Sequence, residues 1–360
     1  MSKITSDLGM KAKKTLEEFV PVIDSKIEME IEKEIGKKFG FNQRQKQVVK
    51  EALEHGKEYI LRPTKRLRGS FVIYGFKLGG GRPDEKIWRA AVGIELVHAA
   101  LLMHDDFMDG DEQRRRGVTT HRYFEQKFGG DAHLGEAMAV TVGDALLCIG
   151  FELIQDTGNA AAMKQVLRGI TNTAWGQGYD VTLEAFTHWT QEDVLVLHRA
   201  KTAVYTYENP LFAGTFLAVL PDGVRNILKD YSRDGGIAFQ LQDDILGVYG
   251  DPAKTGKSAD SDLKQGKCTL LVLKVFEEGT EQQKTAVRRV WGKRDAGREE
   301  LDAAKVAIKD SGSYEYSKNL AMGYAAKAAK TAEKLRELKL NPEAIDYIQG
   351  IAEYMTEREV

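Results

Sequence analysis

Apolar residues recur at intervals of three and four along nearly the whole chain, which is the spacing of one face of an α-helix. Strand-like alternation is hard to find, and only seven prolines interrupt 360 residues. The pattern predicts helices over 11–36, 43–60, 84–109, 134–155, 160–180, 190–207, 224–247, 268–278, 281–291, 297–309, 314–337 and 342–357. We therefore expect an all-α fold, a bundle of ten or more helices.

The breaks between these segments are short. They fall at 79–83, 156–159, 221–223 and 311–313, and none is a long linker rich in proline, glycine and serine. We therefore expect one all-α domain over 1–360, in which 1–44 form an N-terminal helical extension. The stretch 247–267 is the one long loop, and loops of that length in compact domains are usually functional.

Composition narrows the class of protein. The 52 Lys and Arg against 54 Asp and Glu give a net charge of −2, which argues against a nucleic-acid binder. The only cysteines, Cys148 and Cys268, cannot build a disulfide framework and suit a reducing compartment. No uninterrupted apolar run is long enough to span a bilayer, and the first residues lack an apolar signal core. We expect a cytoplasmic protein without a transmembrane segment.

Two groups of aspartates end apolar helices. Asp105, Asp106 and Asp109 close the helix 84–109, and Asp243 and Asp244 close the helix 224–247. Carboxylates at the C-terminal end of a helix oppose its dipole and repel one another, so a cation is expected to compensate them. Positions four apart share a helix face, which places Asp105 and Asp109 together. Hard carboxylate oxygens suit Mg²⁺, which also takes waters and substrate phosphates.

Basic residues follow each acidic group. Three arginines at 114–116 follow the first group, and four lysines at 254, 257, 264 and 267 follow the second. A separate basic cluster contains Lys65 and Arg68. Carboxylates that hold metal beside cations that can hold phosphate oxygens directly are typical of a diphosphate site.

From about residue 45 to the C-terminus, the chain resembles the trans-isoprenyl diphosphate synthases in the content and order of its motifs. The first aspartate motif of that family, followed by Arg-Arg-Gly, matches 105–109 and 115–117. The second, Phe-Gln-x-x-Asp-Asp, matches 239–244. The remaining matches are the Gly-Asp-Ala-Leu-Leu run at 143–147, Lys201 with Thr202, Gly256 with Lys257, and Lys267 with Thr269 nearby.

The chain departs from the family pattern in two places. Gly247 stands where the second motif usually has a third aspartate, as it does in archaeal-type members, so Asp243 and Asp244 must suffice as ligands of that helix. The upstream motif Gly-Gly-Lys-Arg-x-Arg-Pro has become Pro-Thr-Lys-Arg-Leu-Arg-Gly at 63–69. The basic residues of this motif are kept, whereas its glycines and its proline are lost.

The resemblance implies the isoprenoid synthase fold, helices around a central cavity, and a prenyltransferase that condenses isopentenyl diphosphate head to tail with an allylic diphosphate. It implies two or three Mg²⁺ ions held by Asp105, Asp109, Asp243 and Asp244. The expected contacts to the allylic diphosphate are Arg115, Lys201, Lys257 and Lys267. Lys65, Arg68, His98 and Arg116 would hold isopentenyl diphosphate. Lys201, Thr202 and Gln240 are the expected catalytic residues, with the last two directing partial negative charge at the allylic cation.

Product length is expected to depend on Ala100 and Leu101, which stand five and four positions before the first aspartate. Neither is aromatic, so elongation should pass fifteen carbons. We expect geranylgeranyl diphosphate, with geranylfarnesyl or farnesyl diphosphate as alternatives. The resemblance also implies a homodimer with helices such as 134–155 at its interface.

Two other classes of protein share parts of this pattern. A terpene cyclase would carry an Asn-Asp second motif, and that dipeptide does not occur in the chain. A non-catalytic partner subunit would typically have lost the aspartate motifs, and both are present here. Both classes stay open as remote alternatives.

Overall fold

The computed structural model describes residues 6–37, 40–183, 186, 188–251 and 260–355, which are almost entirely helical. A single two-stranded hairpin, β1 (Gln113–Arg114) and β2 (Gly117–Val118), interrupts the helices. The all-α prediction is confirmed. The helices are α1 (Asp7–Ile35), α2 (Gln43–Leu61), α3 (Leu67–Lys77), α4 (Glu85–Asp109), α5 (Thr120–Lys127), α6 (Ala132–Gln155), α7 (Ala160–Leu183), α8 (Gln191–Leu197), η1 (His198–Glu208), α9 (Asn209–Leu217), α10 (Asp222–Tyr249), α12 (Ser261–Gln265), α13 (Leu270–Glu278), α14 (Glu281–Val290), α15 (Arg298–Asp310), α16 (Ser313–Glu333), η2 (Lys334–Leu338) and α17 (Pro342–Met355).

Each predicted helical segment coincides with a helix, but the sequence missed several short ones. The π-helix η1 follows α8 where one continuous α-helix was expected, and the short 3₁₀-helix η2 ends the segment 314–337. Among the missed helices, α3 is buried along most of its length and so shows no polar face. Helices α5 and α12 span only eight and five residues, which is too short to display a helical period.

The chain divides into two compact units. The first consists of 1–13, 165–212 and 220–360, and the second of 14–164 and 213–219. The sequence predicted a single domain, and that stays a prediction. Each unit has its own buried core, so the two are described separately.

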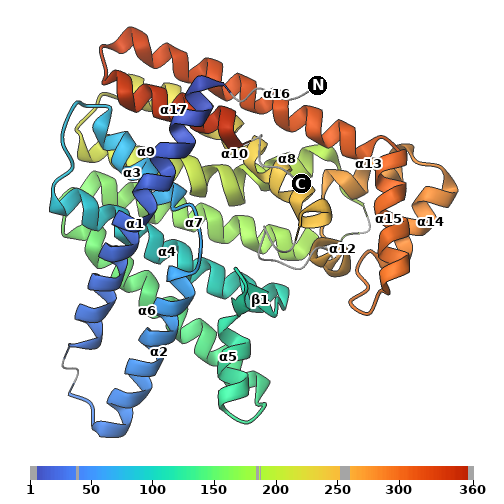
Figure 1. Cartoon of the computed structure of the whole chain (residues 1–360), viewed down its shortest axis with the longest axis horizontal. Helices are drawn as coiled ribbons and strands as arrows, with labels where there is room; N and C mark the ends of the chain where they lie inside the picture. Colours follow the sequence, from blue (N-terminus) through green and yellow to red (C-terminus); the bar gives the residue numbers. More distant parts are fainter. Residues whose placement is uncertain (1–5, 38–39, 184–185, 187, 252–259, 356–360) are drawn as a thin grey trace. The chain divides into compact units, whose positions relative to one another are not determined.

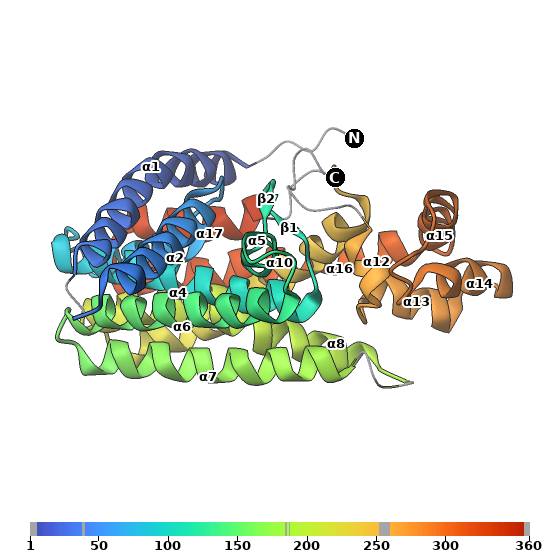
Figure 2. The same cartoon turned by 90° about the horizontal axis from the view of Figure 1, so that it is seen from below.

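In the second unit, α4 and α6 run side by side (Figures 1 and 2). Their backbones come close because Gly93 faces Gly150, and a Cβ at Gly93 would lie 2.5 Å from the Gly150 carbonyl oxygen. Helix α1 buries three isoleucines of this unit, Ile23, Ile27 and Ile31. Helix α1, which lies within the predicted N-terminal extension, thus contributes buried side chains to the core of this unit.

Helices α4 and α6 are also long and apolar enough to cross a membrane, by length and composition alone. The apolar window of α4 is 72% buried, as expected of a core helix. That of α6 is only 39% buried, so α6 keeps an exposed apolar face.

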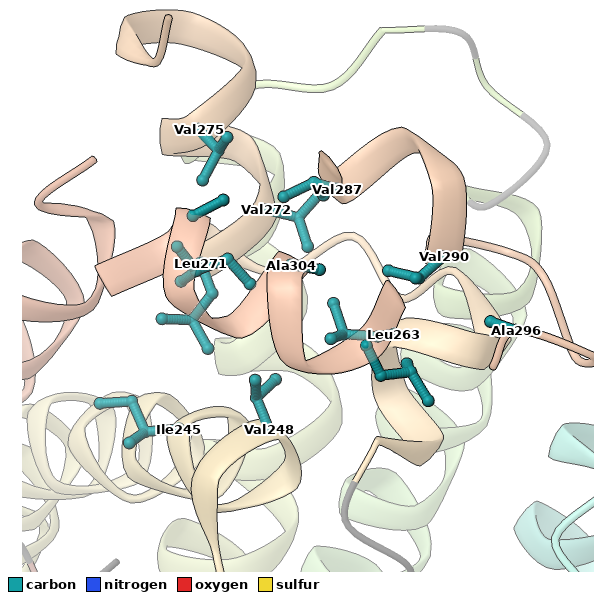
Figure 3. Packing of buried hydrophobic residues seen from close by; sticks show 13 residues of the cluster. Ile245, Val248, Leu263, Leu271, Val272, Val275, Val287, Val290, Ala296 and Ala304 are labelled. Atoms are coloured by element: carbon teal, nitrogen blue, oxygen red, sulfur yellow. The ribbon is translucent and has the colours of Figure 1, made fainter. Parts of the chain in front are cut away.

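In the first unit, α10 packs against α16 and η1. An apolar cluster lies at the C-terminal end of α10. Figure 3 shows Ile245 and Val248 of α10 near Leu263 of α12 and side chains of the following helices. This cluster packs the short helix α12 against the C-terminal part of α10, the helix that carries the second aspartate motif.

Candidate active site

Helix α4 ends with the first aspartate motif and stops at Gly110, whose φ of 70° is the left-handed conformation that favours glycine. Asp105 and Asp109 lie one turn apart on the same face, as the spacing predicted. Asp106, the next residue along the helix, faces a different direction and is completely buried. The three aspartates of the motif therefore have two different environments.

Asp106 is enclosed by protein donors. Tyr59 Oη donates to its Oδ2 at 2.6 Å, and Arg114 Nε donates to its Oδ1 at 2.5 Å. Burial raises the pKa of the Asp106 carboxyl, although Arg114 and Tyr59 oppose that rise. Burial and the neighbouring carboxyl also raise the pKa of Tyr59, so its hydroxyl stays protonated as a donor. With both oxygens engaged, Asp106 serves as an anchor for Arg114, whereas Asp105 and Asp109 are the candidates for metal.

The paired arginines predicted to hold diphosphate form the turn of the β1–β2 hairpin. Arg114 pairs with Gly117 across the hairpin, which leaves Arg115 and Arg116 as its two central residues. Their φ angles are 50° and 65°. Two central residues with positive φ are typical of the type I′ turn, which usually recruits Asn and Gly. Arginines in this conformation are strained, and such strain is common at functional sites.

A cationic cluster forms around His98 in the same unit. Arg68 donates to His98 Nε2 at a distance of 3.0 Å, and because a guanidinium only donates, this nitrogen must be the unprotonated acceptor. Burial, followed by Arg68 and Arg115, holds the pKa of His98 well below its usual range. Burial and Arg66 lower the pKa of Arg115 to about 10. Two arginines, Arg68 and Arg115, therefore surround a buried histidine, and guanidinium groups so placed are suited to binding an anion.

Of the four residues predicted to hold isopentenyl diphosphate, Arg68 and His98 are in direct contact. Lys65 is half-buried in the loop before α3, and Arg116 is exposed on the hairpin. Arg66, between Lys65 and Arg68, is a structural residue, because its buried guanidinium donates to Asp24 and to the Ile60 carbonyl. Arg66 thus ties the altered segment 63–69 to Asp24 of α1 and to the Ile60 carbonyl near the end of α2.

In the first unit, Lys201 and Thr202 lie on the π-helix η1. Such widened turns often occur at functional sites. Lys201 Nζ donates to Asp180 Oδ2 at 2.6 Å, so its charge is held by a carboxylate of α7. Two glycines allow the neighbouring helices to approach η1: a Cβ at Gly176 would lie 2.8 Å from the Lys201 nitrogen, and one at Gly236 would lie 2.3 Å from Ala203.

Gln240 is oriented by partners on both sides. Thr202 Oγ1 donates to its Oε1 at 2.6 Å, and its Nε2 donates to Asp244 Oδ1 at 2.8 Å. An ionised carboxylate only accepts, so Asp244 selects the amide orientation that turns the carbonyl toward Thr202. The other oxygen of Asp244 lies 3.1 Å from His198 Nε2. These contacts orient the Asp244 carboxylate, and its predicted role as a metal ligand beside Asp243 stays a prediction.

Gly247, the unusual residue of the second motif, faces the carboxylate of Asp262. A Cβ at position 247 would lie 2.1 Å from Asp262 Oδ2. Lys267 is close to the same residue, with its Nζ 3.8 Å from Asp262 Oδ1 and its backbone nitrogen bonded to the Asp262 carbonyl at 3.0 Å. Lys257 lies outside the described residues.

The donor sets fit Mg²⁺ better than a metal enclosed by protein. Within the described ranges, no three His, Cys, Asp or Glu side chains come close enough to hold a metal ion by themselves. Mg²⁺ is usually held by one or two carboxylates together with waters and substrate phosphates. Asp105 with Asp109, and Asp243, are such incomplete sets.

The comparison with known families decides the class of this enzyme. The polyprenyl synthetase family matches residues 50–308, well over half of the chain. The chain belongs to this family. The predicted family is confirmed, and this polyprenyl synthetase is a prenyltransferase of the short-chain isoprenyl diphosphate synthase group.

Individual relatives agree with this assignment. The polyprenyl synthetase is 33% identical over 300 residues to geranylgeranyl diphosphate synthase of Methanosarcina mazei, covering 82% of this chain and 86% of the relative. It is 32% identical over 302 residues to the enzyme of the same name from Saccharolobus solfataricus, with the same shares covered. Its fold is similar to the crystal structure of geranylgeranyl pyrophosphate synthase from Corynebacterium glutamicum complexed with isoprenyl diphosphate and magnesium, with a TM-score of 0.86, 27% identity, and 96% and 99% of the two chains covered.

Several residues of this polyprenyl synthetase were missed by sequence reasoning. Asp180 and His198, which hold Lys201 and Asp244, lie outside the recognised motifs. No local signal points to Tyr59 or Arg62, because their partners lie about fifty positions away.

Proposed function

We propose that this polyprenyl synthetase is a geranylgeranyl diphosphate synthase that condenses isopentenyl diphosphate with allylic diphosphates. The observation that carries the proposal is the cationic cluster of Arg68, His98 and Arg115 in the same unit as the carboxylates of Asp105 and Asp109. A diphosphate has the charge to satisfy the first set and, through Mg²⁺, the second.

For the allylic substrate, we assign Asp105, Asp109 and Asp243 to two or three Mg²⁺ ions. Bound Mg²⁺ supplies Lewis-acid stabilisation of the diphosphate leaving group. Arg115, Lys201 and Lys267 add positive charge to that group, and Lys257 is assigned the same role. Because Asp180 already holds Lys201, this lysine is kept in place before the substrate arrives.

For isopentenyl diphosphate, we assign Lys65, Arg68, His98 and Arg116. His98 is neutral and its Nε2 accepts from Arg68, so the histidine orients the guanidinium and offers its remaining N–H to an anion. Gln240 and Thr202 direct oxygen atoms toward the allylic cation. The released pyrophosphate can take up the proton lost in the last step, so no further catalytic base is needed.

Product length follows from the α4 residues before the first aspartate. Ala100 is fully buried and Leu101 half-buried, and neither closes the space as an aromatic ring would. We infer twenty carbons as the main product, with twenty-five as the nearest competitor and fifteen as the shorter one.

We also infer a cytoplasmic homodimer. The exposed face of α6 carries Leu134, Val140 and Cys148, which a second copy would cover. Exposed apolar side chains grouped on one helix are typical of an interaction site. Sedimentation at micromolar concentration should show a dimer, and a monomer there would contradict the inference.

The decisive experiment incubates the purified chain with Mg²⁺, isopentenyl diphosphate and dimethylallyl diphosphate and measures the length of the product. We expect geranylgeranyl diphosphate. A cyclic hydrocarbon from an allylic diphosphate alone would indicate a terpene cyclase. Absence of turnover until a second protein is added would indicate a non-catalytic partner subunit.

A further inference from the structure

Arg62 lies outside the recognised motifs, yet it contacts both strands of the β1–β2 hairpin. Its Nη1 donates to the Arg114 carbonyl at 3.0 Å, and its Nη2 donates to the Val118 carbonyl at 2.9 Å. These carbonyls lie on opposite sides of the turn formed by Arg115 and Arg116. One planar guanidinium therefore spans the base of the turn.

The Arg62 side chain is itself fixed. Glu58, one turn earlier on α2, accepts from its Nε at 2.9 Å and from its Nη2 at 2.6 Å. Its guanidinium carbon lies 4.9 Å from the centre of the Tyr59 ring. Only 8% of Arg62 is exposed. Because the Arg62 guanidinium is already held in place, it loses little further conformational entropy when it binds the two carbonyls.

Gly117 provides the space for this contact. A Cβ at position 117 would lie 2.3 Å from the Arg62 guanidinium carbon and 2.4 Å from its Nε. The backbone of Gly117 is not left-handed, so the chain conformation permits an alanine there, and the three atoms nearest to its Cβ would all belong to the Arg62 guanidinium. Gly117, the glycine of the Arg-Arg-Gly motif, thus leaves room for the side chain of Arg62.

A second set of contacts connects the same hairpin to α4. Arg114 binds Asp106, and Asp106 accepts from Tyr59, which is three residues before Arg62 on α2. The C-terminal end of α2 therefore contacts the hairpin directly through Arg62, the residue that follows the helix, and indirectly through Tyr59. Both contacts act on the residues that flank the strained turn.

We propose that Arg62 is a positioning residue that holds the Arg115–Arg116 turn in its left-handed conformation before a diphosphate binds. The inference rests on the proposed function, because it assigns Arg115 and Arg116 to the two diphosphates. Two arginines in this conformation are unfavourable without support. If the support is lost, binding must order the turn again, and the affinity for both substrates falls.

The test compares Arg62→Met, which keeps the aliphatic stem, Arg62→Lys, which keeps the charge but cannot span both carbonyls, and Gly117→Ala, which displaces the guanidinium while Arg62 is still present. Arg89→Met is the matched control, because Arg89 is a partly buried arginine of the same unit that binds Asp156 at 2.7 Å. Each variant is examined by thermal unfolding, by calorimetric titration with inorganic pyrophosphate, and by steady-state kinetics with both substrates.

We expect the three variants that disturb the contact of Arg62 with the hairpin to bind pyrophosphate about tenfold more weakly. They should also show raised KM values for both substrates. The kcat at saturation should stay within about twofold of the unmodified enzyme. Arg89→Met should lose thermal stability without these changes. Unchanged pyrophosphate affinity in a folded Gly117→Ala or Arg62→Lys variant would overturn the proposal, as would equal weakening in Arg89→Met.

The outcomes separate this inference from the proposed function. If the unmodified enzyme binds pyrophosphate but forms no prenyl product, the proposed function fails, and the pyrophosphate titrations still decide the role of Arg62. If the unmodified enzyme binds no pyrophosphate, both are overturned.

Discussion

The carboxylate of Asp262 lies in the space that a side chain at Gly247 would occupy, with its Oδ2 2.1 Å from the position of such a Cβ. Family members with the longer form of the second motif carry an aspartate at the position of Gly247. In this chain, a carboxylate from α12 comes to that place instead. The apolar cluster around Leu263 and Val248 holds α12 against α10 and so maintains the arrangement (Figure 3).

The substitution Gly247→Asp, which restores the usual family residue, should therefore lower activity and stability when it is made alone. Gly247→Asp places a second carboxylate on Asp262 and should lower both turnover and the free energy of unfolding. The double variant Gly247→Asp with Asp262→Ala should recover much of both. Residues in contact typically show coupling energies of about 0.5–3 kcal/mol, which urea denaturation of the four proteins would measure. Strictly additive effects would mean that the two positions do not compete for one space.

The neighbours Asp105 and Asp106 should give opposite phenotypes. Asp106→Ala leaves the buried Arg114 without its main counter-charge, and breaking such a pair typically costs about 3–5 kcal/mol of stability. Asp105→Ala should cut turnover by several orders of magnitude and leave stability nearly unchanged, since Asp105 lies 3.6 Å from Arg114 and is not its main partner. Asp243→Ala should behave like Asp105→Ala. Urea denaturation together with kcat separates the two classes, and near-normal turnover of Asp105→Ala with Mg²⁺ would refute its assignment.

Substitution of Arg68 or His98 should act on one substrate. Loss of one charge-assisted contact is worth about 1.5–3 kcal/mol, so the KM for isopentenyl diphosphate should rise at least tenfold in Arg68→Met or His98→Ala. The KM for the allylic substrate should change much less, and Lys65→Met should follow the same pattern. Initial rates with each substrate varied in turn provide the measurement, and equal effects on both substrates would contradict the division of roles.

Stability should decline with acid because of buried histidines. Burial, followed by Arg62, lowers the pKa of His55 to about 4. An unfolded histidine takes up its proton near pH 6.5, whereas folded His55 does so only near pH 4, so protons favour the unfolded state between these values. Stability is therefore complete above about pH 6.5 and falls as the pH drops, by up to about 3 kcal/mol for this group. His98 acts in the same direction.

His55→Phe should reduce that pH dependence. The ring of His55 stacks on Tyr123 with centroids 4.1 Å apart, and phenylalanine keeps this contact while removing the titrating group. We expect a shallower loss of unfolding free energy between pH 6.5 and pH 4. His133→Phe, at an exposed position, is the control. The same slope in both variants would show that His55 does not contribute.

Product length should respond to Ala100. The residue is fully buried on α4, so Ala100→Phe adds a ring where there is little space, and accepting a further isoprene unit beside it would cost about 1–3 kcal/mol. The main product should shorten from twenty to fifteen carbons, as measured by chromatography of the dephosphorylated prenyl alcohols. An unchanged length would place the floor of the chain-binding space elsewhere.

The sequence by itself determined the helices and the motifs. Helical periodicity is local, so long amphipathic segments such as α4 and α10 could be predicted to within a few residues. The spacing of Asp105 and Asp109 placed them on one face without further information. Helix α3, buried on most sides, lacked a polar face and so could not be predicted from periodicity.

Only the tertiary structure decided which of the recognised residues are structural. Asp105 and Asp106 are equivalent in sequence, but Asp106 faces Tyr59 and Arg114. Contacts such as Arg62 with the hairpin join residues more than fifty positions apart, and they depend on how helices pack. Periodicity and motif spacing describe the near neighbours of a residue, whereas burial and charge compensation are set by distant ones. For this reason the contacts of Asp106, Asp244 and Asp262 could be found only in the folded chain.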